Sequence, residues 1–157
     1  MTIVPMTGAF SADILRINRD SRPGVAALDA AELQRLQSLS ARHRVAVADD
    51  GRVAGYALAF DRDSAYDGEE FLALRKLLSG PFVYIDQIAV AADHRRRGVA
   101  AALYRGFEGV LCCEVNLQPP NPASSAFHRG CGFDVIETLR TADGRTVELL
   151  KRDVVAP

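Results

Sequence analysis

The segment "IAVAADHRRRGVAAALYRGF", residues 88–107, joins a strand to a helix through a short basic turn. The residues that lead into it, 81–91, are almost continuously apolar, as in a strand from the middle of a sheet. Gly98 opens the following helix, which the pattern predicts to span 98–110. The other elements are assigned outward from this strand, turn and helix.

The turn has the features of an anion-binding site. The first turn of a helix leaves N–H groups without partners, and the helix dipole adds positive charge there. Gly98 allows close approach of a ligand to the main chain, and the alanines at 100 and 101 keep the first turn thin. Three consecutive arginines, 95–97, add mobile charge. We therefore expect a polyanion to bind here.

The remaining pattern predicts alternating strands and helices. Asp29, with Glu32 three residues later, is a capping box that opens the second of two N-terminal helices. The order is that of a mixed α/β sheet flanked by helices. The expected segments are helices at 10–19 and 29–40, a hairpin at 43–60, strands at 81–91 and 111–118, a helix at 122–130, and a hairpin at 132–154 around Asp143-Gly144.

Length and composition bound the class of protein. At 157 residues the chain fits one domain, 1–157, and 25% charged residues are ordinary for a globular protein. The net charge of −1 argues against general binding to nucleic acid or an anionic membrane. No apolar run reaches the roughly 18 residues of a membrane span. The N-terminus lacks the pattern of a signal peptide, so we expect a cytoplasmic protein.

The cysteines and histidines do not indicate a disulfide framework or a metal centre. Three cysteines are an odd number, and we expect Cys112, Cys113 and Cys131 to be buried reduced thiols. The three histidines form no pair with cysteine at metal-ligand spacing, so no metal site is expected.

A second motif follows the basic turn and begins at Asn121. Asn121 is followed by a small residue three positions on, Ser124, then by Phe127 and His128, and then by Gly132-Phe133. Asn121-Pro122 is also a favourable start for a helix in its own right.

Together the two motifs resemble the GNAT superfamily of N-acetyltransferases. The residues "RRRGVA", 95–100, match the R/Q-x-x-G-x-G/A pattern that cradles the pyrophosphate of coenzyme A in that family, and the element order is similar over nearly the whole chain. The resemblance implies a mostly antiparallel sheet with a splay between the strands at 82–91 and 111–118. It also implies an acetyl-CoA-dependent N-acetyltransferase, for which homodimers are common.

The resemblance implies a set of cofactor-binding residues. The backbone of the strand end pairs with the pantetheine arm, N–H groups of the turn hold the pyrophosphate, and the second motif contacts the arm. In this sequence these residues are Ile88, Ala89, Val90, Arg95, Arg96, Arg97, Gly98, Val99, Ala100, Ala101, Asn121, Ser124 and Phe127.

His128 departs from the family, in which most members have Tyr at this position. We expect its imidazole to donate the proton that the coenzyme A thiolate needs as it leaves. Helical spacing places His128 over Ser124 and Ser125, a polar strip rather than a core stripe. A purely structural histidine is the alternative.

The acceptor amine must lose a proton before it attacks a thioester, since a free alkylamine titrates near 10. Candidate bases are Asp86 on the central strand and Glu114 on its neighbour, and either could instead be a structural acid. The resemblance places the oxyanion donor at a backbone N–H near Val90.

An insert at 61–80 precedes the central strand. Its first ten residues carry five acids and one arginine, and the remainder has the spacing of a short amphipathic helix. We expect it to be a lid that attracts a cation, which favours a small amine or an amino-acid-like acceptor and leaves a protein N-terminus or lysine open. Two other classes stay open: a coenzyme A sensor without turnover, and a nucleic-acid-binding module that uses Arg95, Arg96 and Arg97.

Overall fold

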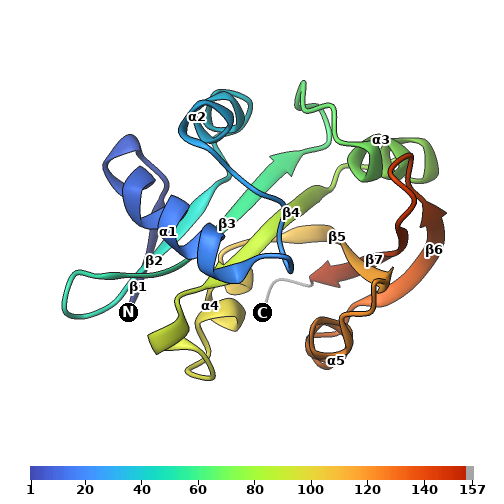
Figure 1. Ribbon diagram of the computed structural model, residues 1–157. Coiled ribbons are helices and arrows are strands. Elements are labelled where there is room, and N and C mark those ends of the chain that lie inside the picture. The colour runs from blue at the N-terminus through green and yellow to red at the C-terminus, as the bar shows by residue number, and fades with distance from the viewer. Residues whose placement is uncertain (155–157) are drawn as a thin grey trace. The chain divides into compact units, whose positions relative to one another are not determined.

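The structure, a computed structural model, describes residues 1–154 and contains one sheet of seven strands in the order β1-β2-β3-β4-β5-β7-β6 (Figure 1). Strands β4 and β5 are parallel, and the β1–β2, β2–β3, β5–β7 and β6–β7 pairs are antiparallel. The predicted mixed, mostly antiparallel sheet is confirmed. The strands are β1 (Thr2–Pro5), β2 (Arg44–Val47), β3 (Val53–Asp61), β4 (Val83–Val90), β5 (Gly109–Gln118), β6 (Asp134–Arg140) and β7 (Thr146–Val154).

Five α-helices accompany these strands in the described residues: α1 (Ser11–Ser21), α2 (Ala30–Ser38), α3 (Glu69–Leu77), α4 (Val99–Arg105) and α5 (Pro122–Gly130). Two short 3-10 turns, Gly8–Phe10 and Ala92–His94, precede α1 and α4. None of these helices is long and apolar enough to cross a membrane.

Most predicted elements are confirmed, and two predictions were wrong. The helix expected at 98–110 ends at Arg105, because Gly106 forms its C-cap and Phe107 turns away with its N–H on the Tyr104 carbonyl. Strand β1 was missed, since four residues that include Pro5 carry too little alternation to signal a strand. The capping box at Asp29 is confirmed in its first half: its side chain accepts a hydrogen bond from the Glu32 N–H at 2.7 Å.

The chain divides into two compact units, Met1–Phe60 with Asp86–Phe107, and Asp61–Ile85 with the described part of Glu108–Pro157. The expectation of a single domain stays a prediction. Strand β4 contributes its first three residues to the second unit and its last five to the first. Each unit is described by itself below.

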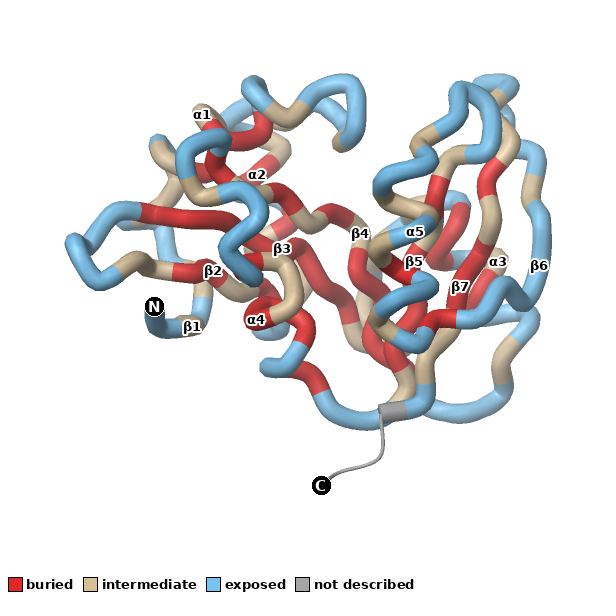
Figure 2. The backbone as a smooth tube through the Cα atoms, turned by 90° about the horizontal axis from the view of Figure 1, so that it is seen from below, coloured by how far each residue is buried: buried red, intermediate tan, exposed pale blue. Residues whose placement is uncertain are grey.

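In the first unit, β3 is the most buried strand, with every residue from Val53 to Phe60 inside (Figure 2). Gly55 has a specific role in this strand. A Cβ added there would lie 2.7 Å from the Ala89 carbonyl oxygen and 3.0 Å from Val99 Cγ1. Only glycine therefore lets β3 approach the end of β4 and the start of α4, the two elements that flank the basic turn.

In the second unit, β5 and β7 pair from Gly109↔Val154 to Gln118↔Thr146, and β6 pairs with β7 at the end of the sheet. Helix α3 buries Phe71 and Leu74, and the Phe71 ring stacks on Tyr84 of β4 at 5.7 Å. Every residue of β6 except Leu139 is exposed (Figure 2).

All three cysteines are free thiols. Cys112 and Cys113 are buried as predicted, and burial raises the pKa of Cys112 to about 12. Cys131 is half-buried rather than buried.

Candidate functional site

The turn before α4 exposes main-chain N–H groups in an unusual conformation. Gly98 is left-handed, with φ 76° and ψ 15°, and Arg96 is left-handed as well, with φ 61°. A left-handed conformation is uncommon for a residue other than glycine. Alternation of left- and right-handed residues turns successive N–H groups toward one side, where they form a concave anion site.

The space at this turn is open. A Cβ built on Gly98 would meet no atom within 4 Å, and no side chain caps the first turn of α4. That first turn also lacks acidic residues. The side chains of the three arginines at 95–97 are exposed, and Arg95 Nε lies 3.4 Å from the Val90 carbonyl oxygen. The turn therefore presents unblocked N–H groups and positive charge together, as a polyanion requires.

The residues that continue the turn into α4 divide by burial. Val99 is buried and anchors the helix, whereas Ala100 is half-buried, as is Ala101. On β4, Asp86, Ile88 and Val90 are half-buried and alternate with the buried Gln87 and Ala89. Because strand residues alternate between faces, Asp86, Ile88 and Val90 share one face of β4.

A buried polar network lies behind the other face of β4. Asn18 Nδ2 donates to Gln87 Oε1 at 3.2 Å and to the Ala26 carbonyl at 2.8 Å, and the Tyr56 hydroxyl donates to Gln87 Oε1 at 2.8 Å. Burial is the main cause that raises the pKa of Tyr56 to about 12, and the charge of Asp86 also raises it. Tyr56 is therefore a neutral donor, and the network fixes the segment between α1 and α2 onto β3 and β4.

Helix α5 begins as the sequence predicts. Asn121 is its N-cap, and its side-chain oxygen accepts a hydrogen bond from the Ser124 N–H at 3.3 Å, with Pro122 at the first helical position. The capping role of Asn121 is thus confirmed.

His128 is 4% exposed and lies near the end of α5. Its Nδ1 is 2.7 Å from the Ser124 carbonyl oxygen and 3.2 Å from Ser124 Oγ. A carbonyl oxygen accepts only, so Nδ1 carries a proton, and in the neutral ring Nε2 carries the lone pair. A proton on Nε2 therefore requires the imidazolium form.

Aromatic rings surround the imidazole. It meets Phe127 edge-on at 5.3 Å and Phe133 edge-on at 5.4 Å. Burial is the main cause that lowers the pKa of His128, the hydrogen bond to Ser124 opposes it, and the charge of Arg152 lowers the pKa further. The expectation of a polar strip was wrong in one respect: Ser124 does contact His128, but the ring packs in an apolar, aromatic setting.

Arg152, on β7, helps to build that setting. Its guanidinium lies over the Phe133 ring, 5.1 Å from the centroid, and its Nη1 donates to the Cys131 carbonyl at 3.1 Å. Sequence reasoning missed this residue, because Arg152 follows β-strand periodicity and carries no motif.

Glu114, the second candidate base, lies beside a polar cluster around Arg145. The guanidinium donates to Asn116 Oδ1 at 3.1 Å, to Glu70 Oε1 at 3.0 Å and to Asp143 Oδ2 at 3.0 Å. Burial lowers the pKa of Arg145, but the hydrogen bond with Asp143 and the charges of Glu114, Glu70 and Asp143 raise it overall. The single positive charge of Arg145 thus interacts with the negative charges of three carboxylates.

The acidic insert is partly used inside the second unit. Glu70 is 7% exposed and pairs with Arg145, while both carboxylate oxygens of Glu69 accept from the Ala142 N–H. These contacts tie the first turn of α3 to the β6–β7 turn. Asp63 and Asp67 are exposed, and so is Glu69 despite its contact with the Ala142 N–H.

The described residues contain no group of three His, Cys, Asp or Glu side chains that could hold a metal ion. The structure brings Ser124 and Phe127 into contact with His128, and it collects the turn residues around Gly98. Asp86 belongs to the first unit and Glu114 to the second. Gly55 and Arg145 were missed, because their roles depend on residues distant in the sequence.

Comparisons with known proteins agree with this architecture. The structure is similar to Ard1 from Thermoplasma volcanium (TM-score 0.74, 18% identity, 99% of this chain and 98% of that one). It is similar to the NatC complex bound to Gag peptide and CoA (TM-score 0.66, 15% identity, 99% of this chain and 100% of that one). It also resembles arylalkylamine N-acetyltransferase 2 from Aedes aegypti (TM-score 0.63, 14% identity, 98% of this chain and 99% of that one). At these identities the likeness shows the fold.

A search of curated proteins finds no match. The model of the acetyltransferase (GNAT) family matches residues 12–133, a span that includes both the basic turn and α5. The chain therefore belongs to the GNAT acetyltransferase family.

Proposed function

We propose that this protein transfers the acetyl group of acetyl-CoA to the nitrogen of an amine acceptor. The turn at 95–101 carries the proposal. It combines two left-handed residues, Arg96 and Gly98, with an open first helical turn and exposed arginines. A pyrophosphate, with several negative oxygens in a small volume, is the ligand that such a turn fits. When bound, acetyl-CoA supplies an acetyl thioester, an acyl group already activated for attack by nitrogen.

Main-chain groups of the first unit would hold the cofactor. The N–H groups between Arg96 and Ala101 bind the pyrophosphate, and Arg95 and Arg97 neutralise its remaining charge. The backbone of Ile88, Ala89 and Val90 pairs with the pantetheine arm, and a backbone N–H near Val90 stabilises the developing oxyanion. Gly55 supports this role, because it allows β3 to pack closely behind Ala89.

Residues of α5 would contact the same cofactor from the second motif. Asn121 and Ser124 donate or accept hydrogen bonds along the arm, and Phe127, which is half-buried, packs against it. Asn121 uses its side-chain oxygen to cap the helix. Its amide nitrogen is the atom we assign to the ligand.

His128 would act as the general acid. In the imidazolium form its Nε2 proton moves to the sulfur as the carbon–sulfur bond breaks, and the ring returns to the neutral state that burial favours. The lowered pKa makes the imidazolium a stronger acid, but it also makes that form scarce at neutral pH. The transfer is therefore favourable for each protonated molecule, and the reaction should weaken as pH rises.

Asp86 or Glu114 would accept the proton that leaves the acceptor nitrogen. Asp86 shares the half-buried face of β4 with Ile88 and Val90, and this placement favours it. Glu114 lies beside the Arg145 cluster, which holds an excess of carboxylates and suits a cationic acceptor. The exposed Asp63 and Asp67 also favour a positively charged amine. We propose a small amine or amino-acid-like acceptor in a cytoplasmic protein.

An amine panel with acetyl-CoA and detection of free thiol tests this function. The panel spans polyamines, arylalkylamines, amino-acid amides and a short peptide with a free N-terminus. We expect thiol release that depends on an amine and disappears in Gly98→Asp. If acetyl-CoA binds tightly in calorimetry but no amine leads to release of free thiol, the protein is a coenzyme A sensor rather than an enzyme. Turnover of the peptide alone would replace the small acceptor by a protein N-terminus.

A further inference from the structure

Exposed apolar side chains gather on α3 and β6, within the second unit. Of the six large apolar side chains exposed in the described residues, four belong to these two elements: Leu72, Leu77, Val135 and Ile136. Scattered single leucines on a surface need no explanation, but a concentration on adjoining elements marks an interaction surface.

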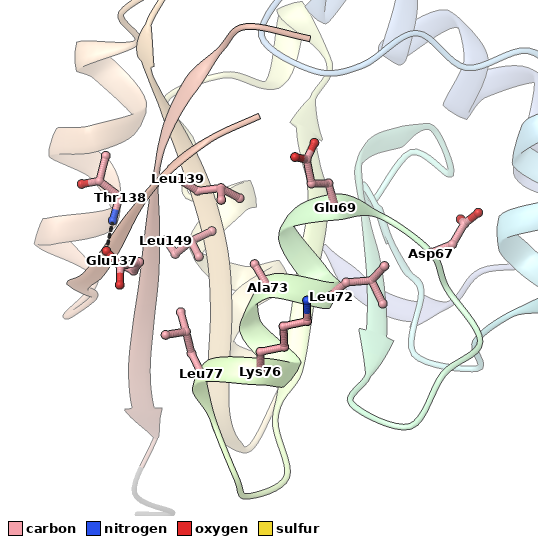
Figure 3. Close-up of a pocket in the computed structure, with 10 residues that line it drawn as sticks. All are labelled: Asp67, Glu69, Leu72, Ala73, Lys76, Leu77, Glu137, Thr138, Leu139 and Leu149. Atoms are coloured by element: carbon pink, nitrogen blue, oxygen red, sulfur yellow. Dashed lines mark hydrogen bonds between the residues drawn. The ribbon is translucent and has the colours of Figure 1, made fainter. Parts of the chain in front are cut away.

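A groove runs beside this patch. It has a volume of about 690 Å³, and α3, β6 and β7 line it (Figure 3). Leu77 of α3 lies toward Leu139 of β6 and Leu149 of β7, whereas Leu72, which also lines the groove, points away from these strands. The size falls within the range of pockets that bind small ligands or peptide side chains.

The rim of the groove is acidic. Three carboxylates line it, from Asp67, Glu69 and Glu137, against one cation, Lys76. Glu69 accepts its hydrogen bonds from a neutral N–H group, so its negative charge is not cancelled there. An occupant that carries positive charge beside apolar groups is complementary to this lining.

Strand β6 adds a third feature. It ends the strand order, so among the described residues one of its edges has no neighbouring strand. Proteins usually protect such an edge with proline, charged side chains, a bulge or a covering segment, and β6 has a bulge between Val135 and Glu137 and three charged residues. The residues of β6, "DVIETLR", include neither proline nor lysine, and β6 is exposed along nearly its full length. Apart from the Thr138 N–H, which donates to Glu137 Oε1 at 3.1 Å, the main-chain groups on the outer edge of β6 can pair with a further strand.

We propose that the α3–β6 surface, made of the groove and the free edge of β6, binds an extended segment of another protein in which apolar and basic residues alternate. The segment adds as a strand to β6. Its apolar side chains, on one face of the strand, enter the groove against Leu77 and Leu139, and its basic residues meet the acidic rim. The proposal concerns a partner surface and does not rest on the acetyltransferase activity.

A second copy of this chain fits the surface less well. A twofold antiparallel pairing centred on β6 places Glu137 opposite Glu137 of the other copy, and like charges directly opposite destabilise a sheet. Both copies would also bring the same acidic rim. Charge complementarity therefore favours a basic partner over self-association.

The test uses the full chain and a fluorescein-labelled decapeptide of alternating lysine and valine, with binding measured by fluorescence anisotropy. We expect saturable binding that weakens with salt, and none for a decapeptide of alternating glutamate and valine. Glu137→Lys should lower the affinity about tenfold, and Leu77→Ser about fivefold. Matched controls are Glu108→Lys, an exposed acid outside the groove, and Leu117→Ser, an exposed leucine on β5; both should stay within about twofold of the parent.

N-methylation of the peptide tests strand addition. Two peptides carry methyl groups on alternate amides, one on the odd and one on the even set, and they suffer the same change in chain flexibility. Because only one set of amides faces β6 in a ladder, one peptide should lose binding and the other should retain it. Equal binding by both, equal binding of the glutamate peptide, or a dimer in light scattering that Glu137→Lys dissociates would each overturn the proposal.

Discussion

At Gly98 the chain offers main-chain N–H groups on an exposed turn, whereas at His128 it offers one side chain enclosed by aromatic rings. The first site is built from consecutive residues in left-handed and helical conformations. The second depends on Ser124 one helical turn away, on Phe133 beyond the helix, and on Arg152 from β7. The comparison teaches that the shape of a turn can be set locally, while the acidity of a buried side chain is set by its packing.

The largest effect is expected from Gly98→Asp in the turn. If this variant bound acetyl-CoA like the parent, the contrast between the two sites would fail. Aspartate adds a negative charge to an anion site and strains a backbone at φ 76°. We expect the affinity for acetyl-CoA to fall by about 100-fold or more in calorimetry of the folded variant. Gly51→Asp, at another left-handed glycine with open space around it, should bind acetyl-CoA like the parent.

His128→Ala tests whether the enclosed side chain takes part in the chemistry. We expect turnover to fall by about 100-fold, the scale of a lost general acid, with little change in the Michaelis constant for acetyl-CoA. His128→Tyr should retain activity and move the alkaline limb of the rate profile upward, since tyrosine titrates near 10. Parent-like turnover and an unchanged profile in His128→Ala would make His128 a structural residue.

His43 is a matched control for that experiment. It is 3% exposed, its Nδ1 accepts from the Ala59 N–H at 3.0 Å, and its Nε2 lies 2.8 Å from the Leu36 carbonyl. Both ring nitrogens thus serve the backbone of the first unit. His43→Gln should lower the free energy of unfolding by about 1–3 kcal/mol, the cost of disturbed buried hydrogen bonds, and leave turnover per folded molecule unchanged.

The pH dependence of stability sharpens the contrast between exposed and enclosed groups. Burial is the main cause that lowers the pKa of both His43 and His128, so the folded state binds fewer protons than the unfolded state below about pH 6.5. Their contribution is full above the unfolded pKa and is lost as pH falls from there through the lower folded pKa, with a slope of at most about 1.4 kcal/mol per pH unit for each. Urea unfolding at pH 7.5, 6 and 5 should show this loss. The double variant His43→Gln/His128→Gln should flatten the dependence, and an equally steep profile would contradict it.

The smallest effect is expected from the exposed acids of the insert. Since Glu69 and Glu70 hold the β6–β7 turn, the pair Asp63→Asn/Asp67→Asn isolates steering from structure. We expect the Michaelis constant for a cationic amine to rise about two- to fivefold at low salt, while that for acetyl-CoA stays constant. If both constants change, or if the effect persists at high salt, the insert does not steer the acceptor.

The fold was largely predictable because its signals are local. The capping pairs at Asp29 and Asn121 place two helix starts correctly, and the apolar run at 81–91 identifies β4. The two errors, at β1 and at the end of α4, arose where the local signal was weak or misleading. Strand β1 is stabilised by its pairing with β2 rather than by its own four residues, and α4 stops at Gly106 sooner than its apolar periodicity suggests.

The sequence by itself determined the basic turn, the order of the elements and the resemblance to the acetyltransferases, because each depends on neighbours in the chain. Only the tertiary structure decided the state of the side chains. It enclosed His128 in aromatic rings, joined Glu70 to Arg145 across 75 residues, and required glycine at 55 because a Cβ there would lie only 2.7 Å from the Ala89 carbonyl oxygen. Burial and charge act through space, so the chemistry of these groups follows from contacts that no run of consecutive residues encodes.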